Sequence, residues 1–234
     1  MSQTDAMLLE HWVRERNADA FKLLAARYAA MVYNTCRRIL GNPTEAEDVT
    51  QECFVILAST DKPIGGYLAP WLHRVAYNRS IARLRAESRR RERETRFAEE
   101  QPMARDMAWN EVGDHVDEAI AELPEKLRVP VVAYFLDGQT HESIALALGI
   151  PRSTVTYRLD KGVECLRKTL KGKGVTVAGV ALAGAIKANA ATTAAPASVV
   201  ANLGKLALSG VNHVAWTTTA APLAKGVTGF WTAK

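Results

Sequence analysis

Cysteine is scarce in this sequence, and its spacing argues against a disulfide or a metal site. The 234 residues include three cysteines, Cys36, Cys53 and Cys165, which stand far apart among apolar neighbours and form no CxxC pair. Buried free thiols in a reducing compartment are the expected outcome. The five histidines are scattered, and no Ser/His/Asp, Cys/His, paired-carboxylate or metal-ligand arrangement stands out. We therefore expect neither an enzyme nor a metal or other cofactor.

Long apolar segments and strand signals are also missing. The N-terminal stretch MSQTDAMLLEHWVRER carries acids and arginines where a signal peptide would need an apolar core, so we expect a cytoplasmic protein. The longest apolar run covers residues 175–186, which is well short of the roughly 20 residues that a membrane-spanning helix needs. Glycine and proline are scarce before residue 172, and no alternating strand pattern of useful length is found. The expected fold class is all-α.

Residues 140–170 have the pattern of two helices joined by a tight turn. Ile144 and Leu148 recur at helical spacing, and Gly149 follows where a helix can end in the left-handed conformation. Pro151 fits the first turn of the next helix. The polar and basic face of this second helix comprises Arg152, Ser153, Thr154, Thr156, Tyr157, Arg158 and Lys161. This is the pattern of a helix-turn-helix DNA reader, although a plain amphipathic helix pair with a solvated basic face would share its periodicity.

The N-terminal part of the chain predicts two further helices. Apolar residues at three-and-four spacing indicate a long helix over residues 18–40, and the Gly-Asn-Pro sequence at 41–43 ends it. We expect Thr44 to cap the next helix. Its apolar residues fall on one face and its acids mostly on the other, among them Asp48 and Glu52. From the residues alone, that acidic face is best explained as solvated.

Arginine concentrates in one predicted helix. Nine arginines lie between residues 74 and 96: Arg74, Arg79, Arg83, Arg85, Arg89, Arg90, Arg91, Arg93 and Arg96. The apolar residues that can form its buried stripe are Trp71, Leu72, Val75, Ile81 and Leu84. Guanidinium groups bind phosphates in a salt-dependent way, and aromatic and amide residues near the start of the helix favour nucleic acid. A membrane surface or an acidic protein is the alternative partner.

Composition divides the chain into two small domains and a tail. The formal net charge of +5 fits a polyanionic partner. We expect an N-terminal domain over 5–97, a linker over 98–113 and a C-terminal domain over 114–171 that contains the helix-turn-helix. Residues 172–234 are rich in Ala, Gly, Val and Thr. They are expected to form a weakly structured extension with one or two short helices that associate with a membrane or a partner.

With both domains in view, the chain resembles an extracytoplasmic-function sigma factor of bacterial RNA polymerase. The segment AEDVTQECF (46–54) resembles the family's acidic helix, which contacts the clamp coiled coil of the largest catalytic subunit. The segment PWLHRVAYNRSIARLR (70–85) resembles the helix that recognises and melts the minus-ten promoter element. Residues 123–159 resemble the domain that reads the minus-thirty-five element. The partners that this implies are core RNA polymerase and promoter DNA, with an anti-sigma factor as a further candidate.

The resemblance also assigns roles to particular residues. It implies a core polymerase contact made by Asp48, Gln51, Glu52 and Phe54. It implies minus-ten binding by Arg74, Asn78, Arg79 and Arg83, together with the loop at 62–66. It implies minus-thirty-five binding by Arg152, Ser153, Thr154, Thr156, Tyr157, Arg158 and Lys161. Within the last set, Thr156 and Tyr157 are expected nearer to base edges, and Arg158 and Lys161 nearer to phosphates.

Asp160, Gly162 and the pair Tyr67-Leu68, which stands where the family often has a phenylalanine, depart from the family pattern, and the tail lies outside it. Asp160 would be repelled by DNA phosphate, and Gly162 costs about 1 kcal/mol of helix stability relative to alanine. A stand-alone helix-turn-helix regulator is one alternative to the sigma factor, and a membrane-associated signalling adaptor that acts through the tail is another. In a third arrangement, the tail holds the sigma domains inactive until a signal arrives.

Overall fold

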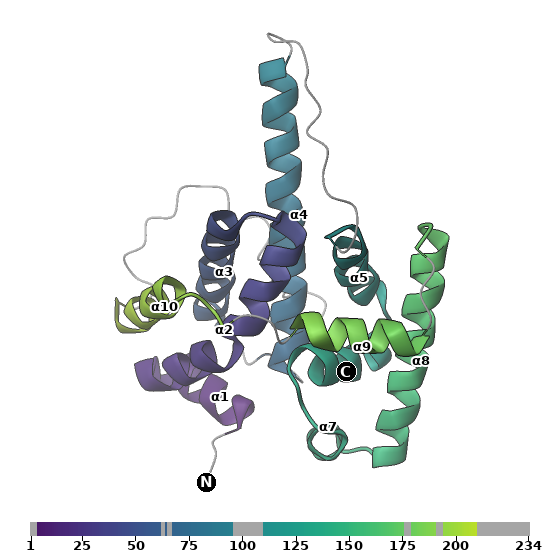
Figure 1. Ribbon diagram of the computed structural model, residues 1–234. Coiled ribbons are helices and arrows are strands. Elements are labelled where there is room, and N and C mark those ends of the chain that lie inside the picture. The colour runs from purple at the N-terminus through teal and green to yellow at the C-terminus, as the bar shows by residue number, and fades with distance from the viewer. Residues whose placement is uncertain are drawn as a thin grey trace.

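Helices form all the regular secondary structure in the residues that the computed structural model describes, which are 4–61, 64, 67–95, 110–175, 179–190 and 194–209. This confirms the all-α fold class. The first unit contains α1 (Asp5–Glu15), α2 (Ala18–Leu40), α3 (Pro43–Ala58) and α4 (Leu68–Thr95). The second contains α5 (Asn110–Glu122), α6 (Glu125–Val131), the π-helical segment η1 (Val132–Leu136), α7 (His141–Leu148) and α8 (Arg152–Gly172). The tail adds α9 (Gly179–Ala190) and α10 (Ala197–Ser209) (Figure 1).

Short polar side chains set where the helices of the first unit begin. The Asn17 side chain accepts a hydrogen bond from the Ala20 N–H at 3.0 Å and caps α2. This helix ends at Leu40, as predicted, because Gly41 takes a left-handed φ of 67°. The predicted cap of α3 was wrong by two residues. Asn42 accepts from the Thr44 N–H at 2.9 Å, and Pro43 fills the first helical position.

Aromatic rings form the centre of the first unit. Trp12 and Phe21 have ring centroids 4.6 Å apart, and Phe21 meets Phe54 edge-on at 6.4 Å. The Trp12 indole N–H donates to the Ala58 carbonyl at 3.1 Å, and Arg16 donates to the same oxygen at 2.9 Å. These contacts bind α1 to the C-terminal end of α3, where the backbone carbonyls lack helical partners. The rings thereby join α1, α2 and α3 in one core.

Helix α4 starts inside the molecule and runs out of it. Its 28 residues span about 42 Å. Trp71, Leu72 and Val75 are buried as predicted, whereas Ile81 and Leu84 are half-buried. Figure 1 shows why, since the C-terminal half of α4 extends beyond the neighbouring helices. A basic sequence suits this half because the solvent screens its charge.

The helices of the second unit pack around apolar residues that continue the core of the first unit. Ile120, Ile144 and Leu166 are fully buried and come from α5, α7 and α8. Pro130 lies inside α6 and has no N–H to donate to the preceding turn. The chain continues from α6 as the π-helical η1, which ends at Leu136. The helix-turn-helix of α7 and α8 is thus supported by the other elements of the unit, with α5 and α6 packed on α8 and η1 packed on α7.

Gly162 has a packing role that its departure from the family pattern did not reveal. A Cβ atom built at this position would lie 2.5 Å from the Val131 Cγ2 atom. Helices α6 and α8 approach closely here, and any side chain would have to push them apart. The packing gained from this close contact offsets the low helix propensity of glycine.

The tail forms two short helices that pack against the rest of the chain. Leu182 and Ile186 of α9 are buried, and α9 lies against η1 and α8. Val199, Leu203 and Ala207 of α10 are also buried, and α10 lies against α2 and α3. The predicted short helices are confirmed, and their apolar sides face this chain. Among the described residues, no helix combines the length and apolar character needed to cross a bilayer.

Candidate functional site

The four predicted polymerase-contact residues on α3 differ in their exposure to solvent. Asp48 is exposed, while Gln51 and Glu52 are half-buried. Phe54 is 0 % exposed and packs on Phe21 in the core. A ring at the centre of the unit supports α3 from inside, so the predicted polymerase contact of Phe54 stays a prediction that would require this ring to become exposed. The structure thus leaves Asp48 as the most accessible of the four.

Predicted polymerase-binding and minus-ten residues are paired with one another. The Arg83 guanidinium donates to the Glu52 carboxylate at 2.7 Å, and Arg79 lies 3.3 Å from the other oxygen of the same group. Glu45 is 3.9 Å from Arg83. This cluster joins α3 to α4, and the Arg79 side chain retains only 11 % exposure. Glu52, Arg79 and Arg83 therefore share a role in helix packing, which sequence spacing did not indicate.

The remaining minus-ten residues lie on other sides of α4. Asn78 is exposed, and Arg74 is half-buried. Burial and the nearby charge of Arg74 lower the pKa of Arg128 on α6, which places Arg74 beside the second unit. Of the loop at 62–66, only Ile64 belongs to the described residues, so the predicted role of this loop lies outside them. The four minus-ten residues do not form one exposed patch in this conformation.

The helix-turn-helix has the predicted geometry. Thr140 caps α7 by accepting from the Ser143 N–H at 3.1 Å. Gly149 ends α7 with a φ of 62°, which a residue with a side chain adopts only with strain. Pro151 then stands at the N-cap of α8, one residue before the position predicted for it. Val155 and Leu159 in the N-terminal half of α8 are buried, and the opposite face of this half is exposed.

The outer face of α8 carries most of the predicted minus-thirty-five residues. Five of the seven are exposed: Arg152, Ser153, Thr156, Tyr157 and Lys161. Thr154 and Arg158 are half-buried at its edges. The Tyr157 side chain is 61 % exposed and can contact a partner without a change in the fold. Asp160 lies on the same exposed face, so the repulsion expected from phosphate also applies here.

Two ion pairs hold the basic side chains of this face. Arg152 lies 3.0 Å from Glu142 of α7, and Lys161 lies 3.0 Å from Glu164. All four side chains are well exposed, so the solvent screens both pairs and each can be exchanged for a contact with a phosphate. Both cations thus remain available to a polyanion.

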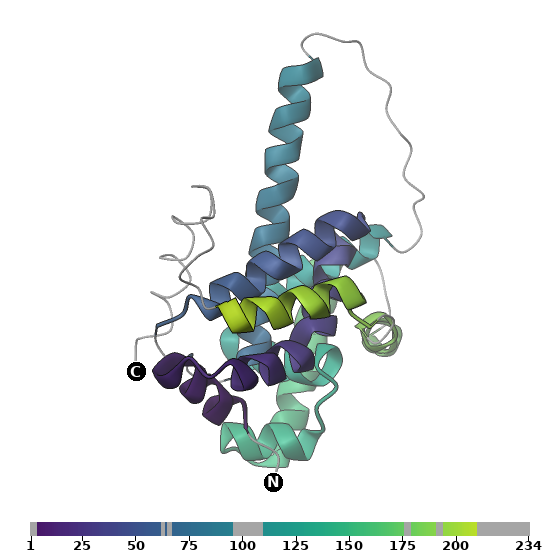
Figure 2. The same ribbon diagram turned by 90° about the vertical axis from the view of Figure 1, so that its left-hand side faces the viewer.

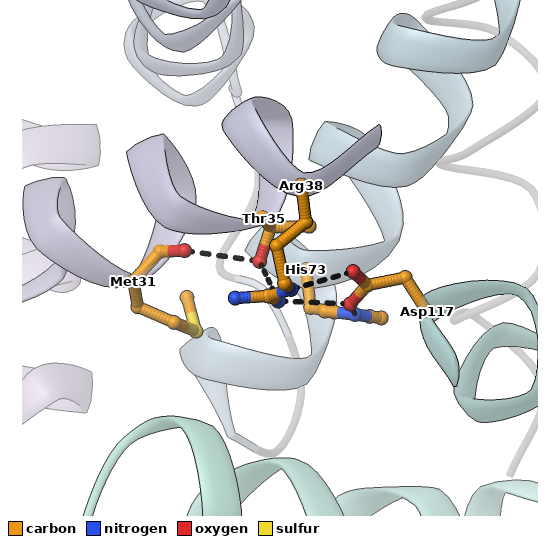
Figure 3. A network of polar contacts seen from close by, with 5 residues as sticks. All are labelled: Met31, Thr35, Arg38, His73 and Asp117. Atoms are coloured by element: carbon orange, nitrogen blue, oxygen red, sulfur yellow. Dashed lines mark hydrogen bonds and ion pairs between the residues drawn. The ribbon is translucent and has the colours of Figure 1, made fainter. Parts of the chain in front are cut away.

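A buried polar cluster connects the first unit to the second (Figure 3). Asp117 of α5 is fully buried and accepts two hydrogen bonds from Arg38 of α2, at 2.8 and 2.9 Å. The His73 Nε2 atom of α4 lies 3.0 Å from the same carboxylate. Burial alone would raise the pKa of Asp117, but Arg38 and His73 outweigh it and lower that pKa to about 2. Asp117 is therefore ionised at neutral pH and can only accept hydrogen bonds.

Sequence reasoning missed this cluster. His73 was among the scattered histidines, and Asp117 was an ordinary acid in an amphipathic helix. The two residues are 44 positions apart, and Arg38 and Asp117 are 79 apart. An acid on the apolar side of α5, beside Ile120, was the only available signal. A further contact joins the units, because the Tyr67 hydroxyl donates to the Ser143 carbonyl at 3.2 Å.

Both units match models of known protein families. A family model for sigma-70 region 2 matches residues 24–90, and one for sigma-70 region 4 matches residues 114–166. The chain is 31 % identical over 174 residues to the ECF RNA polymerase sigma factor SigW of Bacillus subtilis, covering 68 % of this chain and 93 % of that protein. It is 29 % identical over 174 residues to the ECF RNA polymerase sigma factor SigK of a Mycobacterium species, strain KMS, covering 72 % and 86 %.

A similar solved structure is the complex of the sigma factor RpoE with the anti-sigma factor NepR from Bartonella quintana. The TM-score is 0.31 and the sequence identity 18 %, with 64 % of this chain and 96 % of that chain covered. Neither family model extends past residue 166, so the tail helices α9 and α10 lie beyond both.

Proposed function

Because the chain belongs to the extracytoplasmic-function (ECF) sigma factor family, we propose that it gives bacterial core RNA polymerase its promoter specificity and helps to open the duplex. It performs no catalysis of its own. One observation carries the proposal: a single chain has an exposed acid on α3 and an exposed polar recognition face on α8. A stand-alone DNA-binding regulator needs only the second. Core polymerase and promoter DNA place the protein in the bacterial cytoplasm.

Asp48 is the residue proposed to lead the contact with core polymerase. It is the exposed acid of the predicted set, and Gln51 lies one turn further along the same side of α3. Glu52 is already paired with Arg79 and Arg83. Its substitution would therefore disturb the packing of α3 on α4 as well as any contact with polymerase. Asp48 is the cleaner residue to test.

We expect Asp48→Lys to weaken binding to core RNA polymerase at least about tenfold, or about 1.4 kcal/mol. An acidic helix binds a basic surface on its partner, and a lysine in place of Asp48 would be repelled by that surface. The measurement is fluorescence anisotropy of the labelled full chain titrated with core polymerase at fixed salt.

The matched control for this charge reversal is Glu125→Lys, an exposed acid in the first turn of α6 on the second unit. This variant should bind core polymerase as the unaltered chain does. Equal binding by the two variants and the unaltered chain would remove Asp48 from the interface. Failure to bind by both the unaltered chain and a chain of residues 1–171 would favour the stand-alone regulator.

Minus-ten recognition is proposed for the exposed side of α4 around Asn78. Amide and guanidinium groups can hydrogen-bond an unstacked base, and binding a splayed base offsets part of its lost stacking. Arg79 and Arg83 would contribute after their pairs with Glu52 loosen. Arg74 would contribute after the second unit moves away from α4. Minus-ten binding is therefore expected to follow, and not to precede, binding to polymerase.

Minus-thirty-five recognition is proposed for the exposed face of α8, with base readout and phosphate contact by different residues. Tyr157 and Thr156 lie at the centre of this face, one turn from the helix start, where a recognition helix enters the major groove. Lys161 lies one turn further on and suits a phosphate contact.

Substitutions on α8 should separate these two roles. Lys161→Ala is expected to weaken binding to all duplexes alike and to lower the slope of log affinity against log salt by about 0.9. Tyr157→Ala is expected to lower the preference for promoter over unrelated DNA by about 1–3 kcal/mol. Both are measured on the complex of the full chain with core polymerase across a salt series.

Lys168→Ala is the matched control for the salt dependence. Lys168 pairs with the same Glu164 but lies about 10 Å further along α8, away from the helix start. Its removal should leave the salt slope close to that of the unaltered chain. Equal slopes for the Lys161 and Lys168 variants would argue against a groove contact at Lys161.

A further inference from the structure

Helix α10 covers part of the first unit beside the proposed polymerase contact. It lies against both α2 and α3, and Figure 2 shows it alongside α3 on the face turned to the viewer. Its buried residues Val199, Leu203 and Ala207 recur every four positions and form one apolar stripe. Val200 and Leu208 point away and are exposed. Helix α10 thus occupies an apolar groove between α2 and α3 as an amphipathic helix.

One polar contact places the start of α10 next to Asp48. The Ser198 hydroxyl donates to the Glu47 carboxylate at 2.7 Å. Glu47 immediately precedes Asp48 on α3, and Glu52 on the far side of Asp48 contacts α4. The exposed strip of α3 is therefore bounded by α4 along one edge and by α10 along the other.

The exposed strip of α3 between α4 and α10 is too narrow for a partner helix to pack on it without displacing α10. Packed helices have axes about 8–10 Å apart, so a helix lying on α2 and α3 excludes a second helix from the same groove. A partner helix that reached Asp48 from the α2 side would have to displace α10. The α4 side offers no alternative, because Arg79 and Arg83 close it.

The preceding helix keeps α10 close to this groove. Helix α9 is fixed to the second unit by Leu182 and Ile186, and the Lys187 ammonium lies 5.2 Å from the centre of the Tyr134 ring. Six residues, 191–196, then lead to α10. A short tether of this kind gives an effective concentration in the millimolar range. Even a weak helix-groove contact then competes with a partner in solution.

We propose that α10 is a built-in competitor of core RNA polymerase, and that the α2–α3 groove binds either α10 or a helical element of the polymerase. The inference rests on the proposed sigma factor function. It assigns a binding site to the tail, which both family models leave out. The occupant that replaces α10 is a polymerase helix whose apolar side fills the groove and whose basic side meets Asp48.

Releasing α10 should strengthen polymerase binding by the full chain. Leu203→Glu places a charge at a position that is 2 % exposed and should displace the helix. We expect its apparent dissociation constant for core polymerase to fall at least about tenfold, because the competent fraction of molecules rises. Leu208→Glu is the matched control, since the same change falls on a residue that is 70 % exposed. Unchanged or weaker binding by the Leu203 variant overturns the proposal.

A second route tests the same groove without weakening the fold. In a Cys165→Ser background, the pair Ser198→Cys and Glu47→Cys can be joined by a short bis-maleimide, which fixes α10 in place. The joined chain should lose polymerase binding, while the unjoined chain keeps it. Binding by the joined chain equal to that of the unjoined chain overturns the proposal.

Adding Asp48→Lys to Leu203→Glu separates this inference from the proposed function. The competitor role predicts that the two effects multiply, because Leu203→Glu raises the competent fraction and Asp48→Lys weakens the contact itself. If Asp48→Lys weakens binding but Leu203→Glu does not strengthen it, the sigma factor function stands and the competitor role fails. If Asp48→Lys no longer weakens binding once Leu203→Glu is present, the gain comes from exposed apolar surface that binds elsewhere, and the competitor role fails as well.

Discussion

Asp117→Ala is expected to lower the free energy of unfolding by about 3–5 kcal/mol. The variant removes the carboxylate that two hydrogen bonds join to Arg38 and leaves the guanidinium largely buried, with 16 % of its side chain exposed. It also removes the hydrogen-bond partner that the described part of the chain gives the fully buried His73 ring. Urea unfolding of the full chain, followed by circular dichroism, measures the difference.

A second acid on α5, Glu122, provides a control for the loss of the buried Asp117 carboxylate. Glu122→Ala removes an exposed acid from the last turn of α5 and should change the free energy of unfolding by less than about 0.5 kcal/mol. Asp117→Asn keeps the shape and loses the charge, so it should fall between the two. Equal stability of Asp117→Ala and Glu122→Ala would show that the buried cluster does not hold the units together.

The pH dependence of this contribution has a defined direction. The pKa of Asp117 is lowered to about 2 in the folded chain, against an ordinary value near 4 when unfolded. The folded state therefore favours the ionised form, and the contribution is complete above the unfolded pKa. It is lost as pH falls from about 4 towards about 2. The stability gap between the unaltered chain and Asp117→Asn should be constant above pH 5 and shrink in that acid range.

Phe54→Ala is expected to cost about 3–5 kcal/mol of stability, comparable to the loss of Asp117. The ring is fully buried, and its removal opens a cavity between α2 and α3 beside Phe21. Thermal unfolding measures this loss. Phe54→Leu fills most of the cavity and should cost less, which makes it the matched control.

Phe54 also separates a packing role from a contact role. If the ring only supports α3, the folded fraction of Phe54→Ala should bind core polymerase with nearly unaltered affinity. Titration at a temperature where the variant remains folded gives that affinity. A large loss of binding without a loss of stability would restore Phe54 to the polymerase interface.

Local patterns in the sequence predicted the local structure well. The bounds of α2 followed from its apolar spacing and from the Gly41 stop, because periodicity and a left-handed cap are both local. The turn at Gly149 and the exposed face of α8 followed in the same way. Asn42 displaced Thr44 as a cap because both residues can serve, and their spacing to the first helical amide decides between them.

Contacts between distant residues could not be read from the sequence. Glu52 and Arg83 were given separate roles from their separate motifs, and only the packing of α3 on α4 brings them together. Asp117 required α2, α4 and α5 to meet at one point. Composition predicted short tail helices, but a short apolar stripe such as Val199, Leu203 and Ala207 of α10 does not specify the surface that it will cover. The necessity of Gly162 likewise depends on a neighbour, Val131, more than 30 positions earlier.

The cluster of Arg38, His73 and Asp117 also has a thermodynamic consequence for promoter binding. A partner that binds only chains whose two units are separated has an apparent affinity reduced by the separated fraction. If one chain in about a hundred is separated, a promoter that must contact both Arg74 of α4 and the face of α8 is bound about a hundredfold more weakly than by separated chains. Polymerase that holds the units apart then raises DNA affinity by that factor, and DNA raises polymerase affinity equally. Cooperativity between two partners would thus arise from a contact that neither of them touches.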